Sequence, residues 1–580
     1  MKHRRLLAGL AGLTALIVLA FFIWGGTRTP WLSTERYMVA SADRRASEAG
    51  LDILAAGGTA VDAAIAVQAV LSLVEPQSSG LGGGAYMLHW DEATRTIDAY
   101  DGRETAPKGA TPELFLESSG RPRGFFDAVI SGESVGVPGV VAMLWMAHQE
   151  HGRLPWAKLF EPAIRLAENG FTLSPRLHAL IAWSPMLPHL AKSRDYFFEE
   201  GPDGKPAPRA VGTTLRNPAY GTSLRRIARD GPDAFYKGPI AYEIIEAVHN
   251  APTRAGTLSL DDLAGYVPIK RTALCRPYRH YRVCGMPPST SGGLTTLQIL
   301  GILSAFDLGA LAPNSPEAVH LITEASRLAY ADRDLYIGDS DVVDVPIEAM
   351  LDPAYLAARA HMIDPARSLG PAPVAAGTLP AQHGSNWAPN QSISRPSTSH
   401  FSIIDGEGRA VSMTTSVEAP FGSHLMAGGF FLNNQLTDFS FLPEKDGNPI
   451  ANAVAPGKRP RSSMSPTLVF DDKGDLFAAI GSPGGSRIIA YVTQTLVALL
   501  DWGMDMQSAI NLPRHVDRNG PLEVEEGTDL EALIPALQAL GQEVVPAKLT
   551  SGLHGIRVTA DGLDGGADPR REGAALAGPP

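Results

Sequence analysis

The sequence is poor in cysteine, in charged residues and in basic runs. Its 580 residues include two cysteines and 19% charged residues, the net charge is −12, and no dense block of lysine and arginine follows the first few positions. This scarcity of clustered positive charge argues against nucleic acid as a partner. Hydrophobic residues make up 44% of the chain, enough for a large core or two domains, which excludes disorder as a description of the whole chain.

Metal and cofactor signatures are also missing. His148 and His151 lie three residues apart on an expected helix, but no third ligand stands near them and no His-Glu-x-x-His spacing occurs. The stretch from Gly80 to Ala85 matches a dinucleotide fingerprint in form only. A helix is expected before it and a strand after it, the reverse of the order that a bound pyrophosphate requires. We therefore predict no metal and no cofactor, and expect these glycines to let two backbone segments approach closely.

One long uncharged run is present, at the N-terminus. Residues 2–5 read Lys-His-Arg-Arg, and the run from Leu6 to Trp24 contains no charge, which is close to the length that crosses a bilayer. The positive flank keeps the N-terminal end in the cytoplasm and the rest of the protein outside. No small-x-small cleavage signature follows Trp24, so we expect residues 1–30 to form an uncleaved inner-membrane anchor facing the periplasm. Cleavage of this segment would instead release the protein into the periplasm.

The two cysteines, Cys275 and Cys284, flank a short expected hairpin. If Arg279 and His280 form its two-residue turn, counting outward places Cys275 directly opposite Cys284, where a cross-strand disulfide fits. An oxidising compartment would permit that bond. Two unpaired, half-buried thiols are the alternative.

The remaining pattern mixes buried helices with half-buried strands, which indicates an α+β or α/β fold. Apolar periodicity predicts helices within residues 41–74, 141–151, 163–169, 315–330 and 487–502. Alternation predicts strands at residues 85–90, 400–404 and 410–417. The segment from Asp364 to Pro396 is rich in proline, alanine, glycine and serine without periodicity, which predicts a mobile surface connection.

Four polar segments in the last third of the chain carry side chains suited to catalysis. Thr398 opens a predicted hairpin directly after the irregular segment. The others are Asn433–Phe439, with amides beside a carboxylate, Arg459–Pro466, with adjacent hydroxyls, and Gly481–Ser486, which leads into a helix. Paired glycines ahead of a helix leave backbone N–H groups free beside the positive end of the helix dipole, a suitable place for a developing oxyanion. Each segment taken alone is more often a polar loop or a helix-entry turn.

Taken together and in this order, these segments resemble the γ-glutamyltranspeptidase family of N-terminal-nucleophile hydrolases. The resemblance runs from about residue 38 to residue 570. Its motifs are Gly80–Gly84, Asp101–Pro107, Met286–Gly293, Ala329–Arg333, Thr398–His400, Asn433–Phe439, Arg461–Pro466 and Gly481–Arg487. It implies an α+β fold, a four-layer αββα sandwich, in which a large subunit of residues 36–397 pairs with a small subunit of residues 398–580 cut from the same precursor.

The resemblance also implies the catalytic groups. Cleavage between Ser397 and Thr398 would make Thr398 both the new N-terminus and the nucleophile, with its freed α-amino group as the base. Ser416 occupies the position of a hydrogen-bonding threonine of the family. Gly484 and Gly485 match the amides of its oxyanion hole.

Further residues match the family's substrate-binding positions: Arg103, Glu418, Gln435, Asp438, Ser462 and Ser463. The arginine and the two serines would hold the α-carboxylate of a γ-glutamyl group. The aspartate, assisted by Glu418 and Gln435, would hold its α-ammonium. Glu418 stands where many relatives have asparagine. The loop from Phe441 to Ile450 is shorter than the family's lid and contains no tyrosine, which leaves open whether transfer or hydrolysis dominates.

The implied activity is transfer of a γ-glutamyl group from glutathione or a similar donor to water, an amino acid or a peptide, through an ester on Thr398. Two alternatives stay open. A related acylase acting on glutaryl or cephalosporin-type amides would leave Asp438 and Glu418 facing an apolar substituent, at a cost of several kcal/mol. A membrane-tethered binding protein with the same fold would have no activity, although the nucleophile, the carboxylate clamp and the oxyanion glycines are all present.

Overall fold

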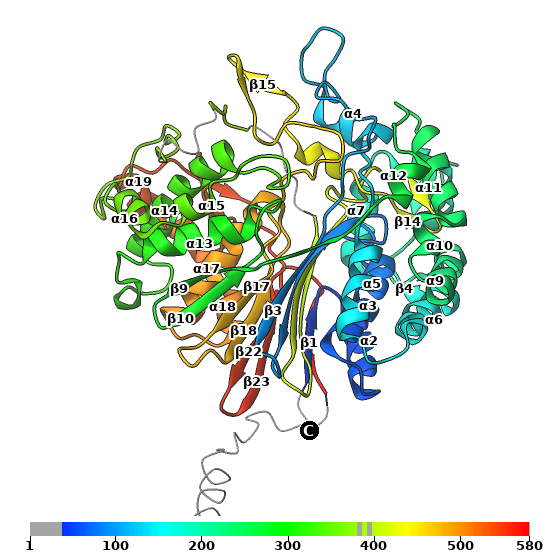
Figure 1. The fold of residues 1–580 in the computed structure, drawn as a ribbon, viewed down its shortest axis with the longest axis horizontal. Helices are drawn as coiled ribbons and strands as arrows, with labels where there is room; N and C mark the ends of the chain where they lie inside the picture. The colour runs from blue at the N-terminus through cyan, green and yellow to red at the C-terminus, as the bar shows by residue number, and fades with distance from the viewer. Residues whose placement is uncertain (1–36, 380–385, 391–396, 579–580) are drawn as a thin grey trace, which may run out of the picture.

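The computed structural model describes residues 37–379, 386–390 and 397–578. Two antiparallel sheets lie face to face at its centre, and helices cover the outer face of each sheet (Figure 1). The layers therefore follow the order helix, sheet, sheet, helix. This is the α+β, four-layer αββα sandwich that the resemblance implied.

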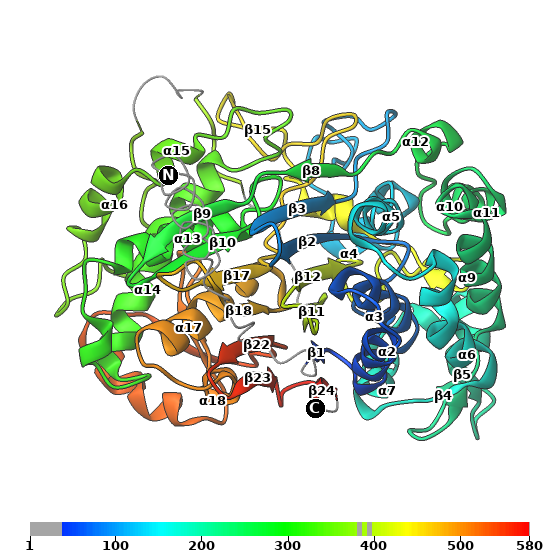
Figure 2. The ribbon, with the colours of Figure 1, turned by 60° about the horizontal axis from the view of Figure 1, so that its bottom comes forward.

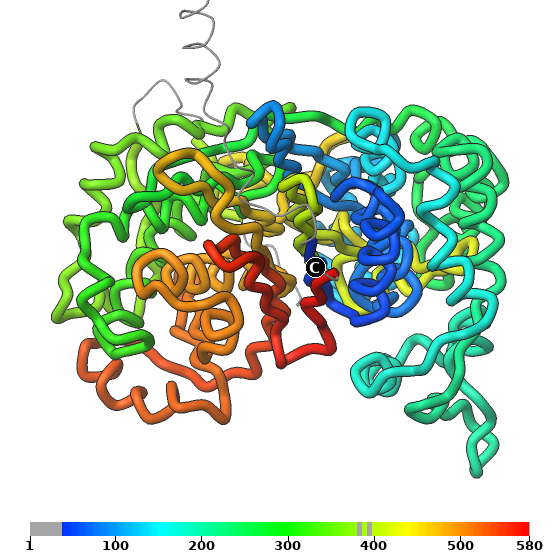
Figure 3. The backbone as a smooth tube through the Cα atoms, turned by 90° about the horizontal axis from the view of Figure 1, so that it is seen from below, coloured from blue at the N-terminus to red at the C-terminus, as the bar shows by residue number. Residues whose placement is uncertain are grey.

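The first sheet contains both ends of the described chain. Its order is β24 (Ala574–Ala577), β1 (Met38–Ser41), β11 (Ser399–Ile404), β12 (Ala410–Ser416), β2 (Gly84–Asp91), β3 (Thr96–Gly102) and β8 (Ile269–Arg271). Because β1 pairs with β24 on one side and β11 on the other, the blue start and the red end of the chain lie side by side (Figure 3).

The second sheet packs against the first. Its order is β23 (Gly562–Ala567), β22 (His554–Thr559), β18 (Leu476–Gly481), β17 (Thr467–Phe470), β10 (Tyr281–Gly285) and β9 (Leu274–Tyr278). Strand alternation gives the first sheet two apolar faces. In β2, Met87 joins the core beneath α2 and α3, whereas its neighbours Tyr86 and Leu88 join the core shared with the second sheet.

The two helical layers differ in the sheet that they cover (Figure 2). The first sheet is covered by α2 (Arg44–Ala55), α3 (Ala60–Val74) and α5 (Val140–His151), with α6 (Glu161–Asn169) packed on α3. The second is covered by α13 (Gly292–Leu303), α17 (Ile488–Leu500) and α18 (Met506–Asn511), with α14 (Pro316–Tyr336) packed on α13. Every residue of α3 is buried, and Thr59 and Asp62 form a capping box at its start.

Smaller elements surround the sandwich. The other helices are α4 (Phe125–Val129), α7 (Pro175–Trp183), α8 (Ala191–Phe197), α9 (Pro218–Asp230), α10 (Asp233–Tyr236), α11 (Pro239–His249), α12 (Leu260–Ala264), α15 (Ile347–Met350), α16 (Pro353–Ala360) and α19 (Ile534–Ala539). The short strands pair as β4 (Phe171–Thr172) with β7 (Thr214–Leu215), β5 (Phe198–Glu200) with β6 (Pro206–Pro208), β13 (Met426–Ala427) with β14 (Phe430–Phe431), and β15 (Glu444–Lys445) with β16 (Asn448–Pro449). A separate sheet joins β19 (His515–Val516), β20 (Leu522–Glu525) and β21 (Val544–Ala547).

The helices and strands predicted from periodicity are confirmed, with small changes at their ends. The largest change is in α14, which continues from the predicted end at Tyr330 to Tyr336.

The segment expected to be a surface connection, residues 364–396, is mostly exposed in the part that follows α16. This part has no helix or strand, but buried charges of α14 hold it in place. Ser368 Oγ donates a hydrogen bond to Glu324 at 2.7 Å, and Arg327 donates to the carbonyl oxygen of Gly370 at 2.6 Å. Buried charged groups require hydrogen-bond partners, and irregular backbone can supply them. Residues 380–385 and 391–396 of this segment lie outside the described residues.

The predicted membrane anchor in residues 1–30 also lies outside the described residues. Within the part of the chain that the structure describes, no helix combines the length and the apolar character needed to cross a bilayer.

The cysteine hairpin has the register deduced from the turn. Strand β9 ends at Tyr278 and β10 begins at Tyr281, so Arg279 and His280 form the turn, and Cys275 pairs with Cys284. The two sulfur atoms are joined in a disulfide. The bond ties together the two strands at one edge of the second sheet.

Thiol labelling tests this disulfide in the expressed protein. Protein exported to an oxidising compartment and denatured without reductant should show no reactive thiol, because both cysteines take part in the bond. Reduction should release both. A Cys275→Ser variant should show one reactive thiol without reduction, which calibrates the assay. Two reactive thiols in the unreduced parent protein would contradict the assignment.

Candidate active site

Thr398 stands at the start of β11, where three segments distant in sequence meet. Its Oγ1 lies 2.9 Å from the Oγ of Ser416 at the end of β12. Its N–H donates to the carbonyl oxygen of Ser78 at 3.2 Å, and Arg571 donates to its carbonyl oxygen at 3.0 Å. Thr398 has a φ of 86°, a strained conformation for a β-branched residue. The surrounding contacts therefore hold this residue in a conformation that it would not choose alone.

The glycine run before β2 allows the chain to pass close to this point. A Cβ atom on Gly83 would lie 2.1 Å from the carbonyl oxygen of Ser416, and one on Gly82 would lie 2.2 Å from that of Phe431. The expectation of a close backbone approach at these glycines is confirmed.

Thr398 opens into a cavity that collects most of the predicted site residues. We call it the Thr398 cavity. Its lining includes Thr398, Ser416, Glu418, Gln435, Asp438, Ser462, Ser463 and Gly485, together with Arg333, Arg461, Met464 and Ile488. Arg103 and Gly484 are not among the described residues that line it. The cavity thus joins the end of β12, the turn at Gln435–Asp438, the loop before β17 and the start of α17.

Arg103 lies behind Asp438. Its Nη2 donates to Asp438 Oδ2 at 2.6 Å, and its Nε donates to the carbonyl oxygen of Pro460 at 3.0 Å. Gln435 Nε2 donates to the same Asp438 oxygen at 3.0 Å. Burial alone would lower the pKa of Arg103, but the negative charge of Asp438 and other neighbours outweighs it and raises the pKa. The guanidinium therefore stays charged and holds Asp438 at the cavity wall.

The two serines are held by a neighbouring loop and by α14. Ser463 Oγ accepts a hydrogen bond from Arg333 Nη2 at 2.7 Å, and Arg333 Nε donates to Ser291 Oγ at 2.9 Å. Ser462 Oγ accepts from the N–H of Met464 at 3.1 Å. Their hydroxyl groups are thus fixed on the wall of the cavity.

Arg333 and Arg461 are cavity residues to which sequence reasoning assigned no role. Arg461 donates to the carbonyl oxygen of Arg333 at 2.8 Å and to Asp334 at 2.9 Å. The sequence feature that could have identified them is their position in two of the family motifs, Ala329–Arg333 and Arg461–Pro466. Two guanidinium groups on one wall make the cavity a suitable place for an anionic group.

The glycine pair lies between β18 and α17. Gly484 has a φ of 141° and Gly485 a φ of 60°, and a Cβ atom on Gly484 would lie 2.7 Å from the ring of Tyr491. Both positions therefore require glycine. Elsewhere at the site, the side-chain amide of Asn434 donates a hydrogen bond to the carboxylate of Glu418 at 2.6 Å and orients it.

The loop from Phe441 to Ile450 forms a small projecting hairpin, β15 and β16 (Figure 1). Its base is anchored by Phe441, whose ring stacks on Phe115 with centroids 4.6 Å apart. Among the described residues that line the Thr398 cavity, none comes from this hairpin.

Glu104 is buried beside Arg103, 3.7 Å from its Nη1, and neither of its carboxylate oxygens has a hydrogen-bond partner among the described residues. Burial raises the pKa of Glu104 to about 8, although the charge of Arg103 opposes the shift. Near neutral pH Glu104 is therefore mostly protonated and adds little negative charge next to Arg103.

Comparison with known proteins gives one family. The family model for gamma-glutamyltranspeptidase matches residues 46–578. The chain is 39% identical over 548 residues to the glutathione hydrolase proenzyme of Escherichia coli K12, covering 92% of this chain and 90% of that protein. It is 35% identical over 553 residues to the glutathione hydrolase proenzyme of Bacillus subtilis strain 168, covering 93% and 91%. The crystal structure of cephalosporin acylase from Bacillus halodurans matches with a TM-score of 0.80 at 28% identity, covering 93% of this chain and 96% of that one.

The raised pKa of Glu104 makes stability depend on pH. Between the ordinary glutamate pKa of 4.5 and the folded-state pKa of about 8, the folded state binds more protons at this position than the unfolded state. The free energy of unfolding should therefore fall as pH rises through this window. Glu104→Gln should remove this contribution, on the order of a few kcal/mol between pH 5 and pH 8.

Urea titrations of the parent and of Glu104→Gln at both pH values measure this difference. Glu444→Gln, on the exposed hairpin, is the matched control and should behave as the parent does. An identical pH dependence in Glu104→Gln and in the parent would show that Glu104 is already ionised in the folded protein.

Proposed function

The chain belongs to the γ-glutamyltranspeptidase family, and we propose that it is a glutathione hydrolase or γ-glutamyltransferase that cleaves itself before Thr398 and then uses Thr398 as its nucleophile. One observation carries the proposal. The Thr398 hydroxyl opens into a cavity whose wall presents a carboxylate at Asp438 and paired hydroxyls at Ser462 and Ser463. That combination suits a γ-glutamyl group, which has an ammonium and a carboxylate on one carbon.

Self-cleavage starts from the strained peptide. Thr398 Oγ1 attacks the carbonyl carbon of Ser397, the C–N bond breaks as the C–O bond forms, and the amide nitrogen takes up a proton. Water then hydrolyses the resulting ester. The positive φ of Thr398 supports this step because cleavage releases the strain. Ser416, 2.9 Å from the attacking oxygen, orients the hydroxyl.

The cleaved protein consists of residues 36–397 and 398–580 as large and small subunits. In the mature site the new α-amino group of Thr398 accepts the proton of its own hydroxyl, which makes a separate histidine unnecessary. The hydroxyl attacks the γ-carbonyl of the donor, and the acyl group remains as an ester until water, an amino acid or a peptide takes it. The N–H groups of Gly484 and Gly485 face the developing oxyanion.

Substrate recognition uses the charges around Asp438. The α-ammonium of the donor binds Asp438, assisted by Gln435 and Glu418, while its α-carboxylate binds Ser462 and Ser463. The guanidinium of Arg103, which is fully buried behind Asp438, reaches the α-carboxylate only when Asp438 turns toward the ammonium. Arg103 and Asp438 form an ion pair at 2.6 Å. A zwitterionic ligand carries one opposite charge for each of these two residues, so neither is left without a partner when the ligand binds.

An acylase acting on glutaryl-type amides is the second candidate, because the matched crystal structure of similar fold is a cephalosporin acylase. Such substrates have no α-ammonium. They would leave the carboxylate of Asp438, which is only partly exposed, facing an apolar carbon, which is unfavourable for a charged group. A non-catalytic, membrane-tethered protein of the same fold would show neither activity.

We further propose that the protein acts outside the cytoplasm, held at the inner membrane by residues 1–30 or released into the periplasm after their removal. The disulfide between Cys275 and Cys284 supports this location, since such bonds persist in oxidising compartments.

Thr398→Ala tests the position of the cut. Its methyl group cannot attack the Ser397 carbonyl, so the purified variant should run as one full-length chain on a denaturing gel, whereas the parent gives two fragments. Thr398→Ser keeps a hydroxyl and should still cut, more slowly. Two fragments from the alanine variant would place the cleavage elsewhere in the chain.

Asp438→Asn tests the γ-glutamyl specificity. Loss of the charge that faces the α-ammonium should weaken transition-state binding of a γ-glutamyl anilide by a few kcal/mol. The kcat/KM for this substrate should fall accordingly. Self-cleavage should continue, because it needs no bound amino acid. The ratio of kcat/KM for the γ-glutamyl anilide to kcat/KM for the glutaryl anilide should decrease.

Asp446→Asn provides the matched control, because Asp446 lies in the exposed β15–β16 turn; this variant should retain the parent's kinetics. If Asp438→Asn kept kcat/KM for the γ-glutamyl anilide within about twofold of the parent, a change well under about 1 kcal/mol, the acylase alternative would become the better description.

A further inference from the structure

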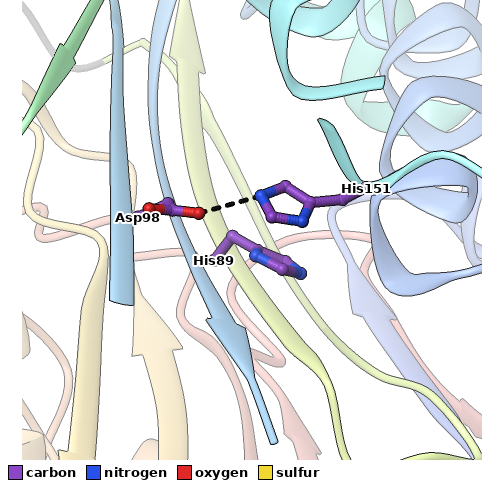
Figure 4. A group of neighbouring side chains, drawn as sticks. All are labelled: His89, Asp98 and His151. Atoms are coloured by element: carbon purple, nitrogen blue, oxygen red, sulfur yellow. Dashed lines mark hydrogen bonds and ion pairs between the residues drawn. The ribbon is translucent and has the colours of Figure 1, made fainter. Parts of the chain in front are cut away.

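A second cluster of ionisable side chains lies away from the Thr398 cavity, between the first sheet and α5 (Figure 4). His89 is on β2, Asp98 is its direct partner on β3, and His151 is the last residue of α5. One ring nitrogen from each histidine and one carboxylate oxygen lie within 4.8 Å of one another. The proposed reaction uses none of these three groups.

His89 is the unexplained member of this cluster. It is 0% exposed, and neither of its ring nitrogens has a hydrogen-bond partner among the described residues. Buried polar atoms are nearly always paired, so an orphaned imidazole at this depth needs an explanation. An imidazole that has no hydrogen-bond partner on either nitrogen can offer a ring nitrogen to a metal ion.

The other two groups are already positioned around it. His151 Nε2 lies 2.9 Å from Asp98 Oδ2, and the rings of His89 and His151 lie with centroids 4.0 Å apart (Figure 4). Lys270 holds the second oxygen of Asp98 at 2.9 Å, which leaves Oδ2 directed to the histidines. Glu150 lies 3.7 Å from His151 Nε2, close enough to serve as an additional ligand.

We propose that His89, His151 and Asp98 bind one divalent transition-metal ion, with Zn²⁺ as the best match. Two imidazole nitrogens and one carboxylate oxygen form a ligand set that suits zinc, whereas Ca²⁺ and Mg²⁺ prefer oxygen ligands alone. Bond lengths to zinc are about 2.0–2.2 Å, so the three ligand atoms would move closer to a common centre when the ion binds. Glu150 or water completes the coordination.

The ion has a structural role. From His89 to Gly84, where β2 enters the active site, the strand runs five residues or about 17 Å. The ion therefore does not contact the reacting atoms. Instead it joins β2 and β3 to the end of α5, the three elements that meet here. Sequence spacing could not reveal the site, because two of the three ligands come from paired strands and only His151 comes from the helix.

Zinc titration of the purified, chelator-treated protein tests the proposal. Calorimetry should show one Zn²⁺ bound per chain, and Zn²⁺ should raise Tm, because an ion that binds only the folded state stabilises it. Mg²⁺ should do neither. His89→Phe keeps an aromatic ring but removes the orphaned nitrogens. It should fold with a metal-free Tm at least equal to the parent's, yet bind Zn²⁺ at least about tenfold more weakly.

Two more variants test the same site in case His89→Phe fails to fold. His151→Gln and Asp98→Asn alter partly exposed side chains and should lose the Zn²⁺-dependent rise in Tm. His280→Ala, in the exposed turn between β9 and β10, is the matched control and should bind as the parent does. Absence of Zn²⁺ binding in the parent at submillimolar concentration, or unchanged binding in His151→Gln and Asp98→Asn, would overturn the proposal.

Discussion

The pairing of β11 with β12 is the constraint on which the active site depends. Ser399 lies opposite Thr415, so Thr398 and Ser416, the next residues outward on each strand, bring their hydroxyls to 2.9 Å. On its other side β12 pairs with β2, where Ser416 lies opposite Gly84. A slip of one residue in either pairing would reverse the direction of every side chain on the strand. The buried apolar residues on both faces of this sheet fix the register, and the register fixes the site.

Charge balance is the second constraint. The region around the Thr398 cavity contains buried guanidinium groups at Arg103, Arg333 and Arg461, and burying such charges without partners is costly. Arg103 pairs with Asp438, and both Arg333 and Arg461 pair with Asp334, although Nη1 of Arg103 has no hydrogen-bond partner among the described residues. The cavity is therefore polar and pre-organised.

Local sequence patterns predicted the parts of the fold and site that depend on neighbouring residues. Periodicity identified α3, α5 and β11, the turn at Arg279 and His280 predicted the register of its hairpin, and the family motifs pointed to Thr398. Tertiary contacts decided the rest. The loop after α16 has no periodicity, yet Arg327 holds it in place through Gly370. Arg333 was part of a recognised motif, but only the packing of α14 beside the loop at Ser463 shows that it lines the cavity. His89 and Asp98 become neighbours only through strand pairing.

The same topology shows how a chain could be cut inside its active site and remain one molecule. The proposed cut lies between Ser397 and Thr398. Because β11 begins at Ser399, the cut interrupts no strand. β1, which would belong to the proposed large subunit, lies between β24 and β11, which would both belong to the small one. Separation would break four strand pairings, β1 with β24, β1 with β11, β2 with β12 and β10 with β17, and would expose the cores of both sheets. In the uncut chain the nitrogen of Thr398 donates to the carbonyl oxygen of Ser78, a contact that would keep the proposed new amino group in place after the cut.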